Sequence, residues 1–491
     1  LTKKTDKGDC MMKSIVDENL VSFKVLEQKI FDYVCELGRL ITQQVLENYD
    51  KELAQGRDKK LYRGKGKRKT SIKTVYGEVE YNRTVYRTKT EQGETAYVYL
   101  LDKAMQMDKI GLISTNLAEK IAMTVTEAPY RVTAETISST CGQTISSGGV
   151  WNMMQRLGER IDEEEYHAVK EMHADQSQGE KIIPVLFEEM DGVWLHMQDS
   201  NHKKMKKQEL KVFTMYEGWD EEKEKEKRST LVEKTMLAGM EPSQKFHEKR
   251  EALIERKYNV DEIQQRILNG DGGSWIKEPY DPDVIFQLDR YHIYQEILRK
   301  LSDKRAQKEA RKLLEEEKTE ELLDFILVYA DSVETTNPID KRSEKARELH
   351  KYLNNNKEGL LPYQKREKQI PAPKEGIIYK NMGVQESQNC TVITLRMKHR
   401  RMRWSVKGAN NLAKVLCRKE NKELCSTIER YTDGLIFTTQ MNEIIETLSA
   451  AKAPKTDGKG NPYVDVLRGH VALLDAATTA SRKVFRDAFI R

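Results

Sequence analysis

The sequence predicts an α/β protein built on a mixed β-sheet with helices on its faces. Apolar and β-branched runs between residues 182 and 238 are short and separated by polar gaps, a pattern typical of neighbouring strands. Two further apolar runs, 267–276 and 283–289, flank or precede segments of helical periodicity. This alternation favours a sheet that is covered by helices rather than an all-β or all-α fold.

Composition limits the class of protein. The 491 residues are enough for two to four domains, and 38% hydrophobic with 33% charged residues is typical of a helix-rich soluble chain. The net charge of +5 says little about partners. No apolar run reaches the roughly 18–20 residues that span a bilayer. The six cysteines are scattered without a Cys-x-x-Cys pair, so we expect reduced thiols, a cytoplasmic protein and no membrane contact.

The N-terminal part divides into three predicted regions. Residues 1–56 form a helical region, whose apolar face either covers a core or forms a dimer. Residues 57–110 form a basic loop followed by a β-hairpin that turns at Gly77, which suits a surface that grips nucleic acid, although basic runs are commonly only solvated. The candidate DNA-binding residues here are Arg63, Lys65, Lys67, Arg68, Lys69 and Lys73.

Residues 111–180 are predicted to be a cluster of short helices. The apolar spacing breaks at Cys141 and Gly142 and resumes at Ser146, which resembles a helix-turn-helix, although any three-helix core shares this pattern. We expect Trp151 to lie in the core.

The region 181–289 is predicted to be the first part of a catalytic core. The apolar run 182–191 delivers Asp191 to a strand end, and the run from Ile267 delivers Asp271 to a turn whose glycines permit close approach. The neighbouring Glu188 and Glu189 are expected to be solvated or sheet-edge charges. Two carboxylates at strand ends are what a divalent-cation site on a sheet requires.

A charged helical insertion is predicted over 290–375, followed by the second part of the core at 376–420 and a C-terminal region at 421–491. Glu386 lies at a polar helix start, and the weaker rival is Glu375. A basic segment follows, with the candidate DNA-binding residues Arg396, Lys398, Arg400, Arg401, Arg403 and Lys407. Glu386 either forms a local salt bridge there or completes a metal site at which the arginines hold phosphate.

Three acids from separate elements favour the second interpretation. Phosphodiester cleavage and strand transfer use two Mg²⁺ or Mn²⁺ ions, which prefer oxygen ligands, and carboxylates supply both charge and geometry. We therefore predict that Asp191, Asp271 and Glu386 are catalytic metal ligands. Asp289 is a rival for the second acid, but its turn lacks glycines. The histidines other than His292 and His399 are expected at the surface.

The same residues carry a resemblance to a known family. The chain resembles the ISLre-type insertion-sequence transposases of bacteria, which are DDE transposases distantly related to the Mutator-like group. The matching pieces are Arg57–Arg63, Thr74–Val79, Asp191-Gly192, Gly270–Gly273 with Trp275-Ile276, Met382-Gly383 with Glu386-Ser387, and Trp404-Ser405 with Gly408-Ala409. An Asp-x-x-His pattern of Mutator-like relatives matches Asp289 and His292, which implies a supporting role or a packed histidine.

This resemblance implies an RNase H-like core and a DNA transposase. Such an enzyme binds the terminal inverted repeats of an insertion sequence, cuts and joins strands with two Mg²⁺ or Mn²⁺ ions, and acts on double-stranded terminal and target DNA as a homodimer or larger assembly. It implies a bacterial, nucleoid-associated protein. Two alternatives stay open, namely a catalytically inactive DNA-binding remnant and an RNase H-like nuclease.

Overall fold

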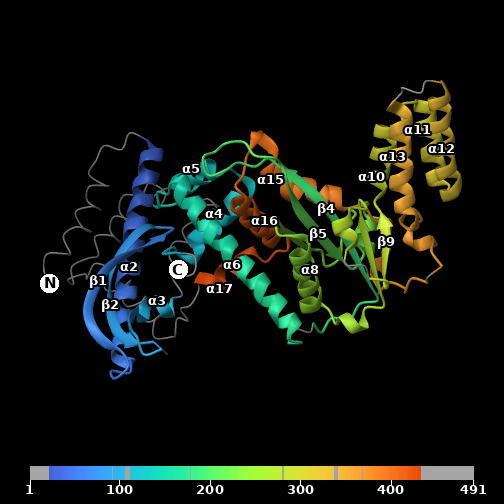
Figure 1. Cartoon of the computed structure of the whole chain (residues 1–491). Helices are drawn as coiled ribbons and strands as arrows, with labels where there is room; N and C mark the ends of the chain where they lie inside the picture. The colour runs from blue at the N-terminus through green and yellow to red at the C-terminus, as the bar shows by residue number, and fades with distance from the viewer. Residues whose placement is uncertain are drawn as a thin grey trace, which may run out of the picture. The chain divides into compact units, whose positions relative to one another are not determined.

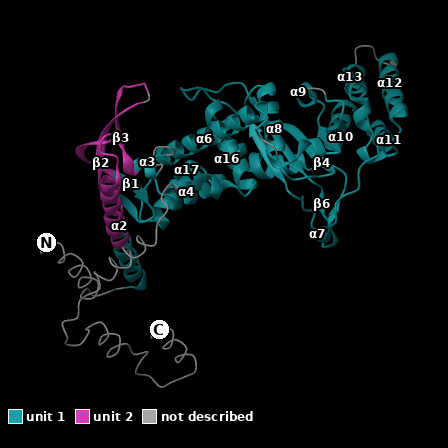
Figure 2. Ribbon diagram, turned by 90° about the horizontal axis from the view of Figure 1, so that it is seen from below, with its two compact units in different colours: residues 1–35, 71–79, 102–434 teal, residues 36–70, 80–101, 435–491 magenta. Residues whose placement is uncertain are grey.

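The computed structural model describes residues 22–432 except 91, 106–110, 177–178, 279–280, 337–340 and 368 (Figure 1). The predictions for residues 1–21 and 433–491 lie outside these residues. The chain divides into two compact units (Figure 2). The smaller comprises residues 36–70, 80–101 and 435–491, and the larger comprises residues 1–35, 71–79 and 102–434.

The smaller unit holds most of helix α2 (Phe23–Gly56) and of a three-stranded sheet, β1 (Arg63–Thr74), β2 (Gly77–Lys89) and β3 (Thr95–Tyr99). Asp50 of α2 is buried and accepts hydrogen bonds from the backbone N–H and the hydroxyl of Thr84 at 3.0 and 2.6 Å, which ties helix to sheet. The prediction of a basic loop was wrong, because the basic run is strand β1 itself. Its exposed cations give no apolar alternation, so pairing with β2 decides its conformation.

Helix α3 (Leu100–Ala104) spans the boundary between the units, and the helices α4 (Thr115–Glu127), α5 (Tyr130–Thr140) and α6 (Ser147–His173) follow in the larger unit. The Ser146 hydroxyl accepts the Gly149 N–H and begins α6 where the sequence predicts a restart. At 27 residues, α6 is longer than the predicted short helices. The expectation for Trp151 was wrong, because the buried stripe runs through Val150 and leaves Trp151 45% exposed.

The central sheet is mixed, as predicted. Its strands are β4 (Val185–Leu195), β5 (Gln208–Tyr216), β7 (Thr235–Gly239), β8 (Gln265–Gly270) and β9 (Val284–Leu288). Their order is β7-β5-β4-β8-β9, in which β4, β8 and β9 run parallel and β5 is antiparallel to both of its neighbours.

Asp191 lies inside β4 rather than at its end. The parallel pairing of β4 with β8 ends at Met190 opposite Gly270, but β5 stays paired with β4 along its whole length and holds Val212 opposite Asp191. The prediction that Asp191 lies at a strand end was therefore wrong for β4 as a whole. Asp191 does, however, directly follow the end of the pairing between β4 and β8. The two apolar runs around Gly192 form one strand.

The two faces of β4 are covered by different elements. Leu186 and Met190 pack in one core cluster with Phe246 of α8 (Ser243–Lys257). Phe187, on the opposite face, packs in another cluster with Tyr363 and Met382. Because side chains alternate along a strand, Asp191 shares the face of Phe187.

The predicted helical insertion is present after β9. It comprises α10 (Arg290–Lys300), α11 (Lys304–Glu315), α12 (Thr319–Thr336) and α13 (Lys341–Asn355), which share a core cluster of their own and stand beside β9 (Figure 1). The remaining elements are β6 (Trp219–Asp220), α7 (Glu221–Lys225), 3₁₀ turns at Val260–Glu262, Lys357–Leu360, Tyr363–Lys365 and His399–Arg401, α9 (Ser274–Lys277), β10 (Ile377–Ile378), α14 (Gln385–Gln388), a π-helical turn at Asn389–Thr394, α15 (Leu395–Met397), α16 (Val406–Glu420) and α17 (Leu424–Thr432).

The outer edge of β7 is covered by the end of α16. The Asn421 side chain accepts the Met236 N–H at 2.7 Å and donates to the Met236 carbonyl at 3.0 Å, so it completes the hydrogen bonding of this edge as a strand would. In the described part of the chain, no helix combines the length and the apolar character needed to cross a membrane.

Candidate active site

Asp191 and Asp271 are brought together by strand register. Gly270 lies opposite Met190, so the next residue on each strand is an aspartate, and neighbouring strands are about 4.8 Å apart. Gly272 has a φ of +81°, a conformation that favours glycine, and the Gly273 N–H donates to Asp271 Oδ1 at 2.8 Å. This turn fixes the Asp271 side chain where β8 ends.

Glu386 comes from a distant part of the sequence and lies in α14. Asn389, three residues later, donates from Nδ2 to Asp191 Oδ2 at 2.7 Å. Residues three apart in a helical turn lie on the same side, so this contact brings Glu386 to the Asp191 face of the sheet. Glu386 itself is exposed.

Glu189 anchors α14 to the sheet, and the expectation that it is solvated was wrong. Its buried carboxylate accepts three consecutive backbone N–H groups of residues 383–385 at 3.0–3.2 Å. It also accepts the Tyr216 hydroxyl at 2.6 Å and the Asn269 amide at 3.1 Å. Burial raises the pKa of Glu189, whereas the hydrogen bonds oppose that rise. This carboxylate thus links β4 to the segment that carries Glu386.

Asp289 and His292 form a pair beside the acids. The Asp289 side chain caps α10 and contacts His292 Nδ1 at 2.9 Å, while His292 Nε2 lies 3.9 Å from Asp191 Oδ1. Burial alone would lower the pKa of His292, but Asp289 and Asp191 raise it to about 9. His292 is therefore a cation at neutral pH, and Asp289 orients it.

The charges of the three acids are coupled. The pKa of Asp191 is raised to about 6, first by burial, with His292 opposing the rise and with Asp271 and Glu386 adding to it. Each of these two acids is thus close enough to disfavour ionisation of Asp191. Three carboxylates facing a single histidinium form a donor set that suits a hard divalent cation.

A fourth acid that sequence reasoning missed, Glu209, lies on β5 and on the face of the sheet opposite Asp191. The Glu209 carboxylate accepts the Trp275 indole N–H and is close enough to Asp271 for the pKa of Glu209 to be raised, with burial as the larger cause. A Cβ on Gly192 would lie 1.9 Å from Glu209 Oε1, so the glycine leaves room for this carboxylate. The Asp-Gly and Asp-Gly-Gly-Ser-Trp motifs were a signal of this packing.

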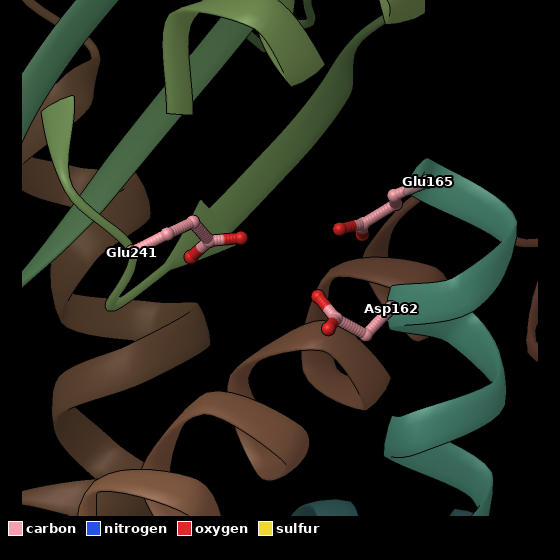
Figure 3. Close-up of side chains that lie close together, drawn as sticks. All are labelled: Asp162, Glu165 and Glu241. Carbon is pink, nitrogen blue, oxygen red and sulfur yellow. The ribbon is translucent and has the colours of Figure 1, made fainter. Parts of the chain in front are cut away.

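A second acidic group, Asp162, Glu165 and Glu241, lies elsewhere in the larger unit (Figure 3). Its ligand atoms all lie within 4.8 Å of one another, closer than those of the three predicted acids. Two buried lysines occupy it. Lys249 Nζ is 2.6 Å from Asp162 and 3.1 Å from Glu165, and Lys414 Nζ is 2.5 Å from Glu165 and 3.2 Å from Glu241. The group is a network of internal ion pairs.

The predicted DNA-binding residues differ in accessibility. Arg396 was wrongly assigned: it is 5% exposed, donates from Nε to the Val125 carbonyl at 2.6 Å and lies over the Tyr130 and Trp404 rings. Lys407 is exposed but pairs with Glu159 at 2.6 Å. The exposed members are Arg63, Lys65, Lys67, Arg68, Lys69, Lys398, Arg401 and Arg403.

Of the other predicted contacts, Lys73 is half-buried, Lys69 pairs with Glu80 at 2.6 Å, and the side chain of Arg400 lies outside the described residues. Two more expectations were wrong. Glu188 is buried against Arg266, 2.6 Å from its Nε, and His247 is buried with Nε2 at the Trp275 carbonyl.

A protein-family model described as "Uncharacterised protein family (UPF0236)" matches residues 16–430. The chain belongs to this family. Similar proteins occur in Caldanaerobacter subterraneus subsp. tengcongensis. One UPF0236 protein, whose name covers four loci, is 25% identical over 83% of this chain and 79% of its own length. Another, whose name covers eleven loci, is 25% identical over 81% of this chain and 78% of its own length.

Proposed function

We propose that this UPF0236 protein is a DNA transposase that binds the terminal inverted repeats of an insertion sequence and catalyses metal-dependent strand cleavage and strand transfer. The observation that carries the proposal is the convergence of Asp191, Asp271 and Glu386, from two adjacent strands and one docked helix, at the end of a parallel pairing.

The sheet supports an RNase H-like core. In chain order its strands lie 3-2-1-4-5, with only the second antiparallel, which is the topology of that fold. The first acid lies on the central strand, the second follows the adjacent parallel strand, and the third lies on a helix beyond an insertion. This is the arrangement that the resemblance to DDE transposases implies.

Asp191, Asp271 and Glu386 would hold two Mg²⁺ or Mn²⁺ ions. When bound, such ions activate an attacking water or 3′-hydroxyl and stabilise the leaving oxygen. The protein's own residues supply the rest. Asn389 and His292 orient Asp191, the Gly272 turn orients Asp271, and Glu189 fixes the segment that carries Glu386.

The relatives add independent support. Two UPF0236 proteins of one genome carry names that cover four and eleven loci. Repetition of near-identical genes is what an element that copies or moves itself produces. Assembly as a dimer on paired DNA ends is part of the proposal, since joining two ends requires two sites.

The test is nicking of a terminal-repeat duplex with Mg²⁺ by the full chain and by Asp191→Asn, Asp271→Asn and Glu386→Gln. We expect each substitution to lower cleavage by more than about a hundredfold, since even residues behind metal ligands cost 10–100-fold. Repeat binding should persist. Asp283→Asn, an exposed acid next to β9, is the control.

Retained cleavage in any of the three variants removes that residue from the site. Binding without cleavage by the wild-type chain, in Mg²⁺ and in Mn²⁺, supports an inactive DNA-binding remnant instead. Cleavage of an RNA–DNA hybrid or of RNA, with none of duplex DNA, supports an RNase H-like nuclease.

A further inference from the structure

The connection between β4 and β5 carries a basic surface that the sequence motifs do not mark. Residues 199–207 form a loop stabilised by Asp199, whose Oδ1 accepts the backbone N–H groups of Asn201 and Lys203 at 2.9 and 2.8 Å. Four lysines in this loop are exposed, Lys203, Lys204, Lys206 and Lys207. The loop continues directly from the strand that holds Asp191.

Backbone hydrogen bonds attach this loop to a segment two hundred residues away. The Trp404 N–H donates to the His196 carbonyl at 3.0 Å, and the Gln198 N–H donates to the Trp404 carbonyl at 2.8 Å. An isolated parallel bridge between Met197 and Trp404 therefore holds the segment that follows α15 beside the end of β4 (Figure 1). Three exposed cations lie on it, Lys398, Arg401 and Arg403.

No ion pair with a described residue neutralises any of these seven cations. Lys407, which follows them in the chain, differs in this respect because it pairs with Glu159 at 2.6 Å. The two carboxylates that flank the loop in sequence are engaged elsewhere: Asp199 accepts backbone N–H groups, and Glu209 accepts the Trp275 indole N–H. A cluster of like charges destabilises its own surface and favours a polyanionic partner.

The side-chain types favour nucleic acid over an acidic protein. Lysine is depleted from protein–protein interfaces, whereas flexible lysines and arginines are the usual contacts to phosphate oxygens.

We propose that residues 203–207 and 398–403 together form one surface, the β4–β5 basic surface, that binds the phosphate backbone of duplex DNA beside the candidate active site. The inference rests on the proposed function. Four residues separate Asp191 from the end of β4, about 13 Å at 3.3 Å per residue, and the loop extends farther. The surface therefore begins within one helical turn of duplex DNA, about 34 Å, from Asp191.

The experiment measures binding of the full chain to a fluorescent duplex of about 30 base pairs of random sequence, in EDTA, over a series of salt concentrations. The variant replaces Lys203, Lys204, Lys206 and Lys207 by Gln. Each lost phosphate contact lowers the slope of log K against log salt by about 0.9, so we expect a slope smaller by about 3–4.

A matched control replaces Lys304, Lys308, Lys312 and Lys318 of the helical insertion by Gln, with the same change in net charge. Its slope should equal that of the wild type. An unchanged slope in the loop variant, or an equal decrease in the control, overturns the proposal. So does a loop variant whose slope changes on an RNA duplex and not on DNA. Both variants change exposed residues, and an unchanged thermal unfolding midpoint verifies their folding.

Failure of this inference is distinguishable from failure of the proposed function. If the wild type cleaves terminal-repeat DNA and the loop variant keeps its salt slope, the proposed transposase activity is supported and the proposed DNA-binding surface is overturned. If the wild type never cleaves while the loop variant has a smaller salt slope, the DNA-binding surface is supported and the catalytic proposal is overturned.

Discussion

At the scale of single residues, Gly192 shows how a sequence motif can encode packing on the far side of a sheet. The glycine follows Asp191, yet the space it leaves is filled by Glu209, which holds Trp275 four residues beyond Asp271. Lys211, on the same strand as Glu209, lies 5.6 Å from the Trp275 ring. The segment that follows Asp271 is therefore held by side chains on the face of the sheet opposite Asp191.

We predict that Gly192→Ala and Glu209→Ala each lower cleavage, because each frees the Trp275 indole from its acceptor. Their effects should not add in the double variant, since both act on one contact, and a coupling energy of about 1–2 kcal/mol is expected. The measurement is a double-mutant cycle on the nicking rate and on urea unfolding. Fully additive effects on the rate would show that the two residues act separately.

Lys414 illustrates a buried charge whose function is structural. Its ammonium is fully buried among Asp162, Glu165 and Glu241, which raise its pKa although burial lowers it. We predict that Lys414→Met destabilises the protein by about 3–5 kcal/mol, because it leaves the carboxylates with Lys249 alone. Lys419 lies on the same helix and forms a partly exposed ion pair with Glu127. Lys419→Met should change the free energy of unfolding, measured in urea, by less than about 1 kcal/mol. Similar effects of both substitutions would contradict a buried network.

At the scale of elements, helix α8 is fixed to the sheet by charge as well as by apolar packing. Arg266 of β8 donates to Glu188 at 2.6 and 3.0 Å and to Glu251 of α8 at 2.9 and 3.0 Å. Arg250 of α8 also contacts Glu251. Periodicity predicts both elements, but it cannot predict this network, because a charged residue in a sequence looks the same whether it is solvated or paired.

This network predicts a dependence of stability on pH. Burial alone would raise the pKa of Glu251, but Arg250 and Arg266 hold it at about 2, below its ordinary value of 4.5. A depressed carboxyl pKa stabilises the fold above the unfolded-state pKa, and that stabilisation is lost as pH falls from about 4.5 towards 2. Glu251→Gln should be less stable at pH 7 and should lose less stability across this window. Parallel pH profiles of wild type and variant in urea unfolding would rule out this role.

At the scale of the whole molecule, the sequence predicts the sheet, the helical insertion and the three acids, because apolar runs and glycine turns are local signals. It places Arg396 wrongly among DNA contacts, since a basic segment does not show which guanidinium turns inward to Val125. It also misses Glu209 and the lysine loop at 203–207. The contact of Glu209 with Trp275 depends on strand register, and the lysines are visible in the sequence but their position beside residues 398–403 depends on the distant pairing with Trp404.

The two acidic groups lead to the last prediction, which separates them by metal binding. Mg²⁺ or Mn²⁺ that binds only the folded protein stabilises it by about 1.4 kcal/mol at ten times Kd. We therefore expect the metal to raise the thermal unfolding midpoint of the wild type. The rise should be lost in Asp191→Asn, because Asp191 faces Asp271 and Glu386 with a single histidinium nearby. Asp162→Asn should keep the rise, since Lys249 and Lys414 already neutralise that group. A metal-induced rise that survives Asp191→Asn and disappears in Asp162→Asn would move the cation site to the lysine-filled cluster.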